Sequence, residues 1–274
     1  LKMRYTKKSM IVGGLIGLCI GLFNSLREGG TLNELINSKQ LNEPQNEFAQ
    51  YVPQVDLEKP VSSAKVKSFN ILGSELLIPT PPKFFRLPED HDLTKQIASI
   101  EEDPMNDILA IFLPENQLSS FLSNDFEGLS IDKICLAKIY KKMKKVSPKR
   151  SLLHETKQGF EEQGDQMMSK LRGTISDFYD KRLKTISKEY DIEMLTKVSD
   201  FVFLPLHEES ENHFSMSLLA KMELNGLSEV VSATMSMCYT KKTIHQVVVR
   251  GSKDDLEWTR LVCSQWTKEL LEIN

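Results

Sequence analysis

Five side chains that can bind metal ions or exchange protons are crowded into residues 207–213, the stretch HEESENH. They are two imidazoles and three carboxylates, from His207, Glu208, Glu209, Glu211 and His213. Imidazole nitrogens and carboxylate oxygens are ligands for zinc and copper. His207 and His213 are therefore a candidate metal site. The alternative, which we favour, is a solvated hairpin turn, where polar residues are expected anyway.

A second cluster is cationic. Residues 138–150, KIYKKMKKVSPKR, carry seven positive charges. On a domain held near a membrane, these charges could contact anionic lipid headgroups or an acidic partner. The residues expected to make that contact are Lys141, Lys142, Lys144 and Lys145. The alternative, which we favour, is a charged strand edge that prevents one sheet from pairing with another.

Motifs for the common enzyme classes are missing from the sequence: it contains no G-x-S-x-G, H-E-x-x-H, Walker A or G-x-G-x-x-G pattern. His91 stands between Asp90 and Asp92 at the start of an expected helix, where capping is the better explanation. Cys135 and Cys238 fall on expected strands and are predicted to be small buried residues. We therefore expect no catalytic residues and no cofactor.

The elements that must position these residues form an α+β domain over residues 71–274. The first half is expected to contain strands and helices in alternation, read from apolar spacing and from proline stops. Strands are predicted at 71–78, 107–114 and 130–143, and helices at 90–103, 115–124 and 151–190.

The second half of the domain is expected to be an antiparallel meander closed by a helix. Alternating runs separated by short turns predict four strands, at 192–206, 213–224, 227–239 and 243–250, with Asn225-Gly226 as one turn. Residues 252–274 are predicted to be a helix whose apolar stripe includes Trp266. Ala233, Met235 and Met237 are the less polar alternating set of the third strand, so we expect them to face that helix. The predicted fold is an antiparallel sheet, built from the meander and the N-terminal strands, covered by helices.

The chain begins with a basic segment and an apolar run. Residues 9–26 are 18 uncharged residues that follow Lys7 and Lys8 directly. A helix of that length reaches roughly 27 Å, which is close to the ~30 Å of a bilayer core. Positive charge stays on the cytoplasmic side, so the body is expected in the bacterial periplasm and the N-terminus in the cytoplasm. The residues chosen to mark this membrane segment are Met10, Gly13, Gly17, Gly21 and Phe23.

Two interpretations of residues 1–28 remain open, a single-pass inner-membrane anchor and a cleaved signal peptide that would give an exported soluble form. No A-x-A site stands near the run, which favours the anchor. Gly13, Gly17 and Gly21 recur every four residues, an arrangement that lets two membrane helices approach closely. A homodimer could therefore form through this glycine face.

The next segment and the charge balance separate the anchor from the body. Residues 29–70 are rich in Asn, Gln, Glu, Ser and Pro and are predicted to be a flexible linker. The formal net charge is −3, and residues 1–28 hold five cations and one Glu, or +4. The remainder therefore carries −3 minus +4, or −7. An acidic body argues against nucleic acid as a partner.

The order of parts over residues 71–273 resembles the domain shared by PsbP, Mog1 and DcrB proteins. The matching pieces are LLIPTPPKFFRL at 76–87, the meander at 195–250 and DDLEWTRLVCSQWTKELL at 254–271. The long insert at 151–190 departs from the compact members. The C-terminal helix, with Asp-Leu-x-Trp, Trp and Asn, also resembles that of uncharacterised exported or membrane-anchored proteobacterial proteins.

The resemblance to this domain implies a non-enzymatic role, because its members are mostly binding or assembly modules. We therefore expect a membrane-tethered periplasmic module that binds or assembles an envelope protein. An exported hydrolase-type enzyme, whose site is assembled from distant residues, is the alternative.

Overall fold

The computed structural model describes residues 66–101, 106–123, 129–130, 132–145, 147–162, 196–224 and 227–274. Several predictions fall outside these residues: the membrane segment marked by Met10, Gly13, Gly17, Gly21 and Phe23, the linker up to residue 65, the predicted helix beyond residue 162, and the Asn225-Gly226 turn. Among the helices of the described part, none combines the length and the apolar character that crossing a bilayer requires.

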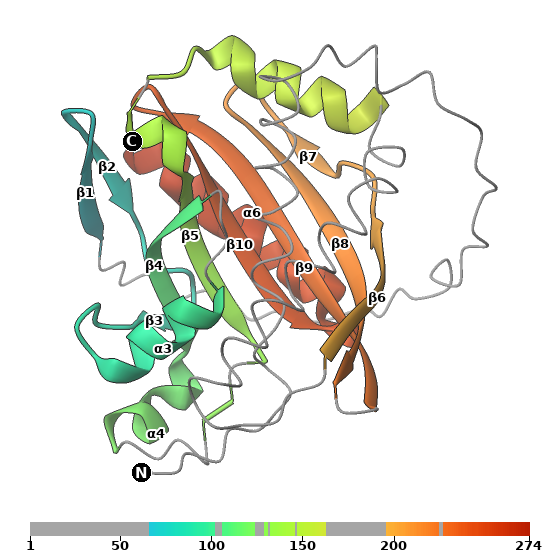
Figure 1. Cartoon of the computed structure of the whole chain (residues 1–274). Coiled ribbons are helices and arrows are strands. Elements are labelled where there is room, and N and C mark those ends of the chain that lie inside the picture. The colour runs from blue at the N-terminus through green and yellow to red at the C-terminus, as the bar shows by residue number, and fades with distance from the viewer. Residues whose placement is uncertain are drawn as a thin grey trace.

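An antiparallel sheet of eight strands forms the body, with helix α6 (Leu256–Ile273) behind it (Figure 1). The strand order is β3-β4-β5-β10-β9-β8-β6, and β7 pairs with β8 beside this path. The bounds are β3 Phe84–Arg86, β4 Asn106–Pro114, β5 Ile134–Tyr140, β6 Thr196–Phe203, β7 Glu208–Glu209, β8 His213–Leu224, β9 Leu227–Thr240 and β10 Thr243–Ser252. The predicted α+β class, with a meander of β6, β8, β9 and β10, is confirmed.

Strand β5 lies inside the sheet, paired with β4 on one side and β10 on the other. The interpretation of residues 138–150 as a charged sheet edge is therefore wrong. Lys138, counted with that cationic run, is fully buried, and its Nζ donates to the Glu101 carbonyl at 3.2 Å. Residues 141–150 leave the sheet beyond the end of β5, where η2 (Lys141–Lys144) begins.

The first strand prediction resolves into a hairpin. β1 (Lys67–Ile71) and β2 (Ser74–Ile78) form a separate two-stranded sheet. Leu72 and Gly73 turn the chain with φ of 52° and 78°, the left-handed conformations of a type I′ turn. A single strand over 71–78 was expected because Leu72 continues the apolar run. The hairpin also begins at Lys67, within the stretch predicted as linker.

The remaining helices agree with expectation. α3 (Asp92–Glu101) confirms the helix predicted at 90–103. η1 (Glu115–Gln117) and α4 (Leu118–Leu122) together form the predicted short helix after Pro114. Residues 150–162 are helical, at the start of the long helix predicted over 151–190. η3 (Lys253–Asp255) leads into α6 through a capping box between Ser252 and Asp255.

Helix α6 covers the sheet face that carries the polar alternating set of β9. Thr234 Oγ1 lies 2.8 Å from Thr259 Oγ1 of α6, and Cys238 belongs to the same buried cluster as Cys263 and Trp266. The prediction that the less polar set faces the helix is wrong: Ala233, Met235 and Met237 point to the opposite face. Both sets are buried, so the polarity of the alternation could not identify the helix side.

Trp266 is fully buried, as predicted. Its ring meets Phe112 edge-on, with centroids 5.2 Å apart, and its Nε1 donates to the Pro79 carbonyl at 2.8 Å. The side chain of Asn274 holds the neighbouring β2, accepting from the Leu77 N–H at 2.9 Å and donating to the Leu77 carbonyl at 2.8 Å. The hairpin is thus fastened to α6.

Candidate functional site

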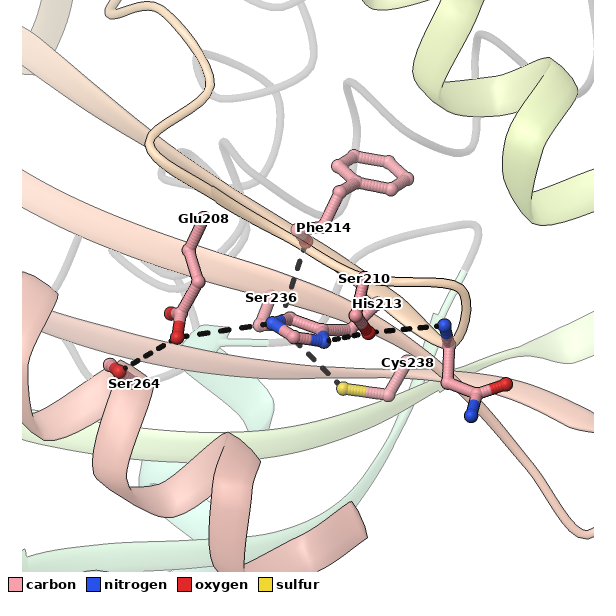
Figure 2. A network of polar contacts seen from close by, with 8 residues as sticks. Glu208, Ser210, His213, Phe214, Ser236, Cys238 and Ser264 are labelled. Carbon is pink, nitrogen blue, oxygen red and sulfur yellow. Dashed lines mark hydrogen bonds and ion pairs between the residues drawn. The ribbon is translucent and has the colours of Figure 1, made fainter.

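The stretch HEESENH forms a tight turn between β7 and β8, beside α6 (Figure 2). The Ser210 N–H donates to the His213 carbonyl at 2.8 Å, so these two residues face each other across the turn. His207 lies before β7, where its N–H donates to the Ser215 carbonyl at 3.2 Å. The turn therefore places Ser210, and not His207, opposite His213.

The His213 ring lies between a hydroxyl and a carboxylate, as Figure 2 shows. Its Nδ1 is 2.7 Å from Ser210 Oγ, and its Nε2 is 4.0 Å from Glu208 Oε1. The second separation is too long for a hydrogen bond. Glu208 is held from the helix side, because Ser264 Oγ of α6 donates to Glu208 Oε1 at 2.9 Å. The cluster thus links the turn to α6.

Both histidines of the stretch favour the neutral form. Burial lowers the pKa of His213 below its usual 6.5, and the carboxylate of Glu208 opposes this effect. Burial also lowers the pKa of His207, and the Arg260 guanidinium adds to the lowering. A neutral imidazole can accept a proton or coordinate a metal ion at pH 7.

The hydroxyl–imidazole pair has the composition of a nucleophile beside a general base. Ser210 Oγ has a local structural task as well, because it accepts the Asn212 N–H at 3.2 Å within the turn. The carboxylate that would orient the imidazole, Glu208, is beyond hydrogen-bonding distance of Nε2. The arrangement supports proton exchange between Ser210 and His213, and in this geometry it serves first to fix the turn.

The described residues offer no third ligand for the predicted metal site at His207 and His213. Glu208 acts electrostatically on both His207 and His213. Within the described part of the chain, however, no three or more His, Cys, Asp or Glu side chains are grouped so as to hold a metal ion. Zinc sites use three or four protein ligands. A metal at His207 and His213 stays a prediction.

The cysteines of the body are packing residues. Cys135, Cys238 and Cys263 are buried free thiols between the sheet and α6, as predicted for the first two. Burial raises the pKa of Cys238 to about 12, and it also raises those of Cys135 and Cys263. Because the thiolate is the reactive form, these groups are poor nucleophiles at pH 7.

A buried charged cluster lies on the sheet face opposite α6, and sequence reasoning missed it. The Arg250 guanidinium of β10 pairs with the Glu101 carboxylate at 2.7 Å, and both side chains are buried. Nearby in the sheet, Gln246 Nε2 donates to Asn106 Oδ1 at 3.1 Å. The one signal in the sequence is a cation within an apolar strand, as in VVVR at 247–250. The partner, 149 positions away, could not be identified from that signal.

The predicted cationic contact residues are distributed along and beyond η2. Lys144 pairs with Asp107 at 2.8 Å, and Lys141 approaches the same carboxylate at 4.0 Å. Lys144 and Lys145 are exposed, and the side chain of Lys142 lies outside the described part. The contact of these lysines with an anionic surface stays a prediction.

No protein-family model matches the chain, and a comparison with curated proteins finds no match either. The resemblance to the PsbP, Mog1 and DcrB domain therefore stays a prediction.

Proposed function

We propose that this chain is a binding module without catalytic activity, tethered to a bacterial inner membrane by residues 9–26 and acting on an envelope protein from the periplasmic side. The membrane location is supported by the uncharged run behind Lys7 and Lys8. The layout resemblance to binding and assembly domains supports the role.

The observation that carries the proposal is a pair of exposed leucines on α4. Leu118 is 38% and Leu122 is 70% exposed, and they stand one helical turn apart. Between them Phe121 is buried against Phe85, with ring centroids 5.6 Å apart, and against His91 at 4.5 Å. The helix is thereby fixed to the domain while it presents two apolar side chains outward. Leu118 and Leu122 together offer a small apolar contact surface to a partner protein.

Site-specific photocrosslinking of the full chain in cells tests the contact. A photoreactive residue at position 122 should give a discrete crosslinked product, and Leu118→Glu should abolish it. The same probe at the exposed Lys268 of α6 is the matched control and should give no such product. Equal products from both positions, or none from position 122, would overturn the α4 contact.

The tether has a separate test. Carbonate-washed membranes should retain the full-length chain, and a reporter fused after Asn274 should be active only outside the cytoplasm. Activity in the cytoplasm would overturn the orientation. A shortened soluble product would show that the segment is cleaved.

The alternative hydrolase function is favoured by one observation, the 2.7 Å contact of Ser210 Oγ with His213 Nδ1. An activated serine should react with a fluorophosphonate probe, and Ser210→Ala and His213→Ala should both abolish the reaction. If the probe does not label the native chain, Ser210 and His213 serve only to fix the turn.

A further inference from the structure

The structure brings cations from two distant segments to one end of the sheet. Ser147 Oγ donates to the Lys242 carbonyl at 3.0 Å, and the phenolic hydroxyl of Tyr239 donates to the Pro148 carbonyl at 3.4 Å. The segment after η2 is thereby laid against the β9–β10 turn. We call the resulting surface the basic end; its exposed members are Lys144, Lys145, Lys149, Arg150, Lys241 and Lys242.

The basic end has more positive charge than its acidic neighbours neutralise. Lys144 pairs with Asp107 at 2.8 Å, and Arg150 pairs with Glu211 at 3.3 Å. The other four members, all lysines, have no ion pair within the described residues. This surplus stands on a body whose sequence is acidic, so the charge is concentrated locally and attracts an anion.

The β9–β10 turn holds two of these lysines against local preference. Thr240 pairs with Thr243, so Lys241 and Lys242 are the two central residues of the hairpin turn, with φ of 47° and 58°. Such a turn favours Asn-Gly, because side chains such as lysine are strained at positive φ. Both lysines are exposed, and Lys242 is held in the fold through its backbone carbonyl, which accepts from Ser147 Oγ. An exposed non-glycine residue held at positive φ points to a function for its side chain.

An exposed leucine, Leu72, stands at the tip of hairpin β1–β2, at the same end of the molecule as the β9–β10 turn. In Figure 1 the β1–β2 tip and the β9–β10 tip lie at the same end of the molecule. Leu72 of the β1–β2 tip is 46% exposed and has φ of 52°, again a conformation that a leucine seldom adopts. The end thus combines an apolar tip with flexible cationic side chains, the combination found on surfaces that lie at a lipid interface.

We propose that the basic end docks on anionic phospholipid headgroups, with Lys145, Lys149, Lys241 and Lys242 over the headgroups and Leu72 at the interface. This rests on the proposed membrane location. Lysines bind headgroups as point charges, without the bidentate geometry that arginine brings to specific phosphate recognition. An acidic body and an exposed leucine favour a lipid surface over nucleic acid. Each lysine near an anionic surface raises the affinity about fivefold.

Lysine acetylation followed by mass spectrometry tests this contact on the full chain. The chain is reconstituted into vesicles of phosphatidylcholine alone and of phosphatidylcholine with phosphatidylglycerol. Labelling of Lys145, Lys149, Lys241 and Lys242 should fall about fivefold in the anionic vesicles, and high salt should restore it. Lys268, exposed on α6, is the internal control and should be labelled equally in both.

The double substitution Lys241→Asn with Lys242→Gly separates a lipid contact from a structural role. It installs the sequence that the turn prefers, so the melting temperature should rise. Protection of Lys145 and Lys149 by anionic lipid should nevertheless be largely lost. Unchanged protection in this variant would overturn the proposal, as would equal labelling of the wild type in both vesicle types. Protection by a DNA oligonucleotide but not by anionic vesicles would assign the surface to nucleic acid instead.

The proposed tether and the proposed lipid contact of the basic end can be tested independently. Retention in carbonate-washed phosphatidylcholine vesicles depends on residues 9–26 alone. If the chain is retained there but its lysines are not protected in anionic vesicles, the lipid contact is overturned and the tether stands. If the chain is lost from neutral vesicles but binds anionic vesicles in a salt-sensitive way, the tether is overturned and the lipid contact stands.

Discussion

Trp266 joins three parts of the fold through one side chain: α6, strand β4 through Phe112, and the residues after β2 through Pro79. We predict that Trp266→Ala lowers the free energy of unfolding by about 3–5 kcal/mol, because it opens a large cavity and removes the donor to the Pro79 carbonyl. Thermal melts of the chain should show the loss directly. Lys268→Ala, exposed on the same helix, should cost less than about 0.5 kcal/mol. Equal melting of the two variants would mean that Trp266 is not buried.

His245 makes the domain sensitive to acid. It is fully buried on β10, and burial lowers its pKa from 6.5 to about 4. The unfolded chain binds the proton near pH 6.5 and the folded chain only near pH 4, so the free energy of unfolding falls between these values and levels off below them. The fall due to His245 is roughly 3 kcal/mol.

The substitution His245→Gln removes this titration and should flatten the dependence. Urea midpoints measured at neutral pH and near pH 4.5 give the comparison, since the other titrating groups are common to both chains. The midpoint of the variant should shift less between the two conditions. An identical shift in wild type and variant would show that His245 takes up its proton without cost in the folded state.

One amide side chain at the end of α6 hydrogen-bonds hairpin β1–β2, which also packs into the core through Ile71, Leu76 and Ile78. Asn274 both donates to and accepts from Leu77, so it pairs with the edge of β2 as a strand residue would. We predict that Asn274→Ala speeds hydrogen exchange in β1 and β2 and leaves the exchange of β9 and β10 unchanged. Asn274→Asp keeps only the acceptor and should give an intermediate effect. Uniformly faster exchange would mean that Asn274 supports the whole fold.

The elements themselves were largely predictable, because apolar spacing and proline stops mark them in the sequence. The meander, α3, α4 and α6 all followed from such patterns. Which face of β9 packs against α6 was not predictable, because both alternating sets of β9 are buried. The polar set faces the helix because small hydroxyl side chains such as that of Thr234 pair with Thr259 of α6. Lys138 was assigned to the surface because nothing local distinguishes a lysine that a helix end will cover.

The candidate site was predictable in part. HEESENH does form a polar turn, and His213 is its central group. Ser210 could have been found as well, since a Ser-x-x-His sequence can close a two-residue turn. The contact of Glu208 with Ser264 could not, because it depends on how α6 docks 56 positions further along the chain.

At the scale of the whole molecule, proteolysis can locate the N-terminal boundary of the folded body. β1 begins at Lys67 and pairs along its whole length with β2. We predict that limited proteolysis cuts the chain between residues 29 and 66 and leaves a resistant fragment that starts near Lys67. N-terminal sequencing or mass spectrometry identifies the cut. A resistant fragment that includes residues 29–66 would refute the linker predicted there.

Because β5 pairs with β10, the sheet cannot be completed until late in the synthesis of the chain. Val248 lies opposite Leu136, so the two halves of the sheet meet through residues about 110 positions apart. Contacts of such long range make folding slow. During synthesis, β4 and β5 emerge with one edge of β5 unpaired until residue 252 has been made. An unpaired edge is a template for pairing with another chain, so the nascent chain is exposed to aggregation until β10 and α6 have been made.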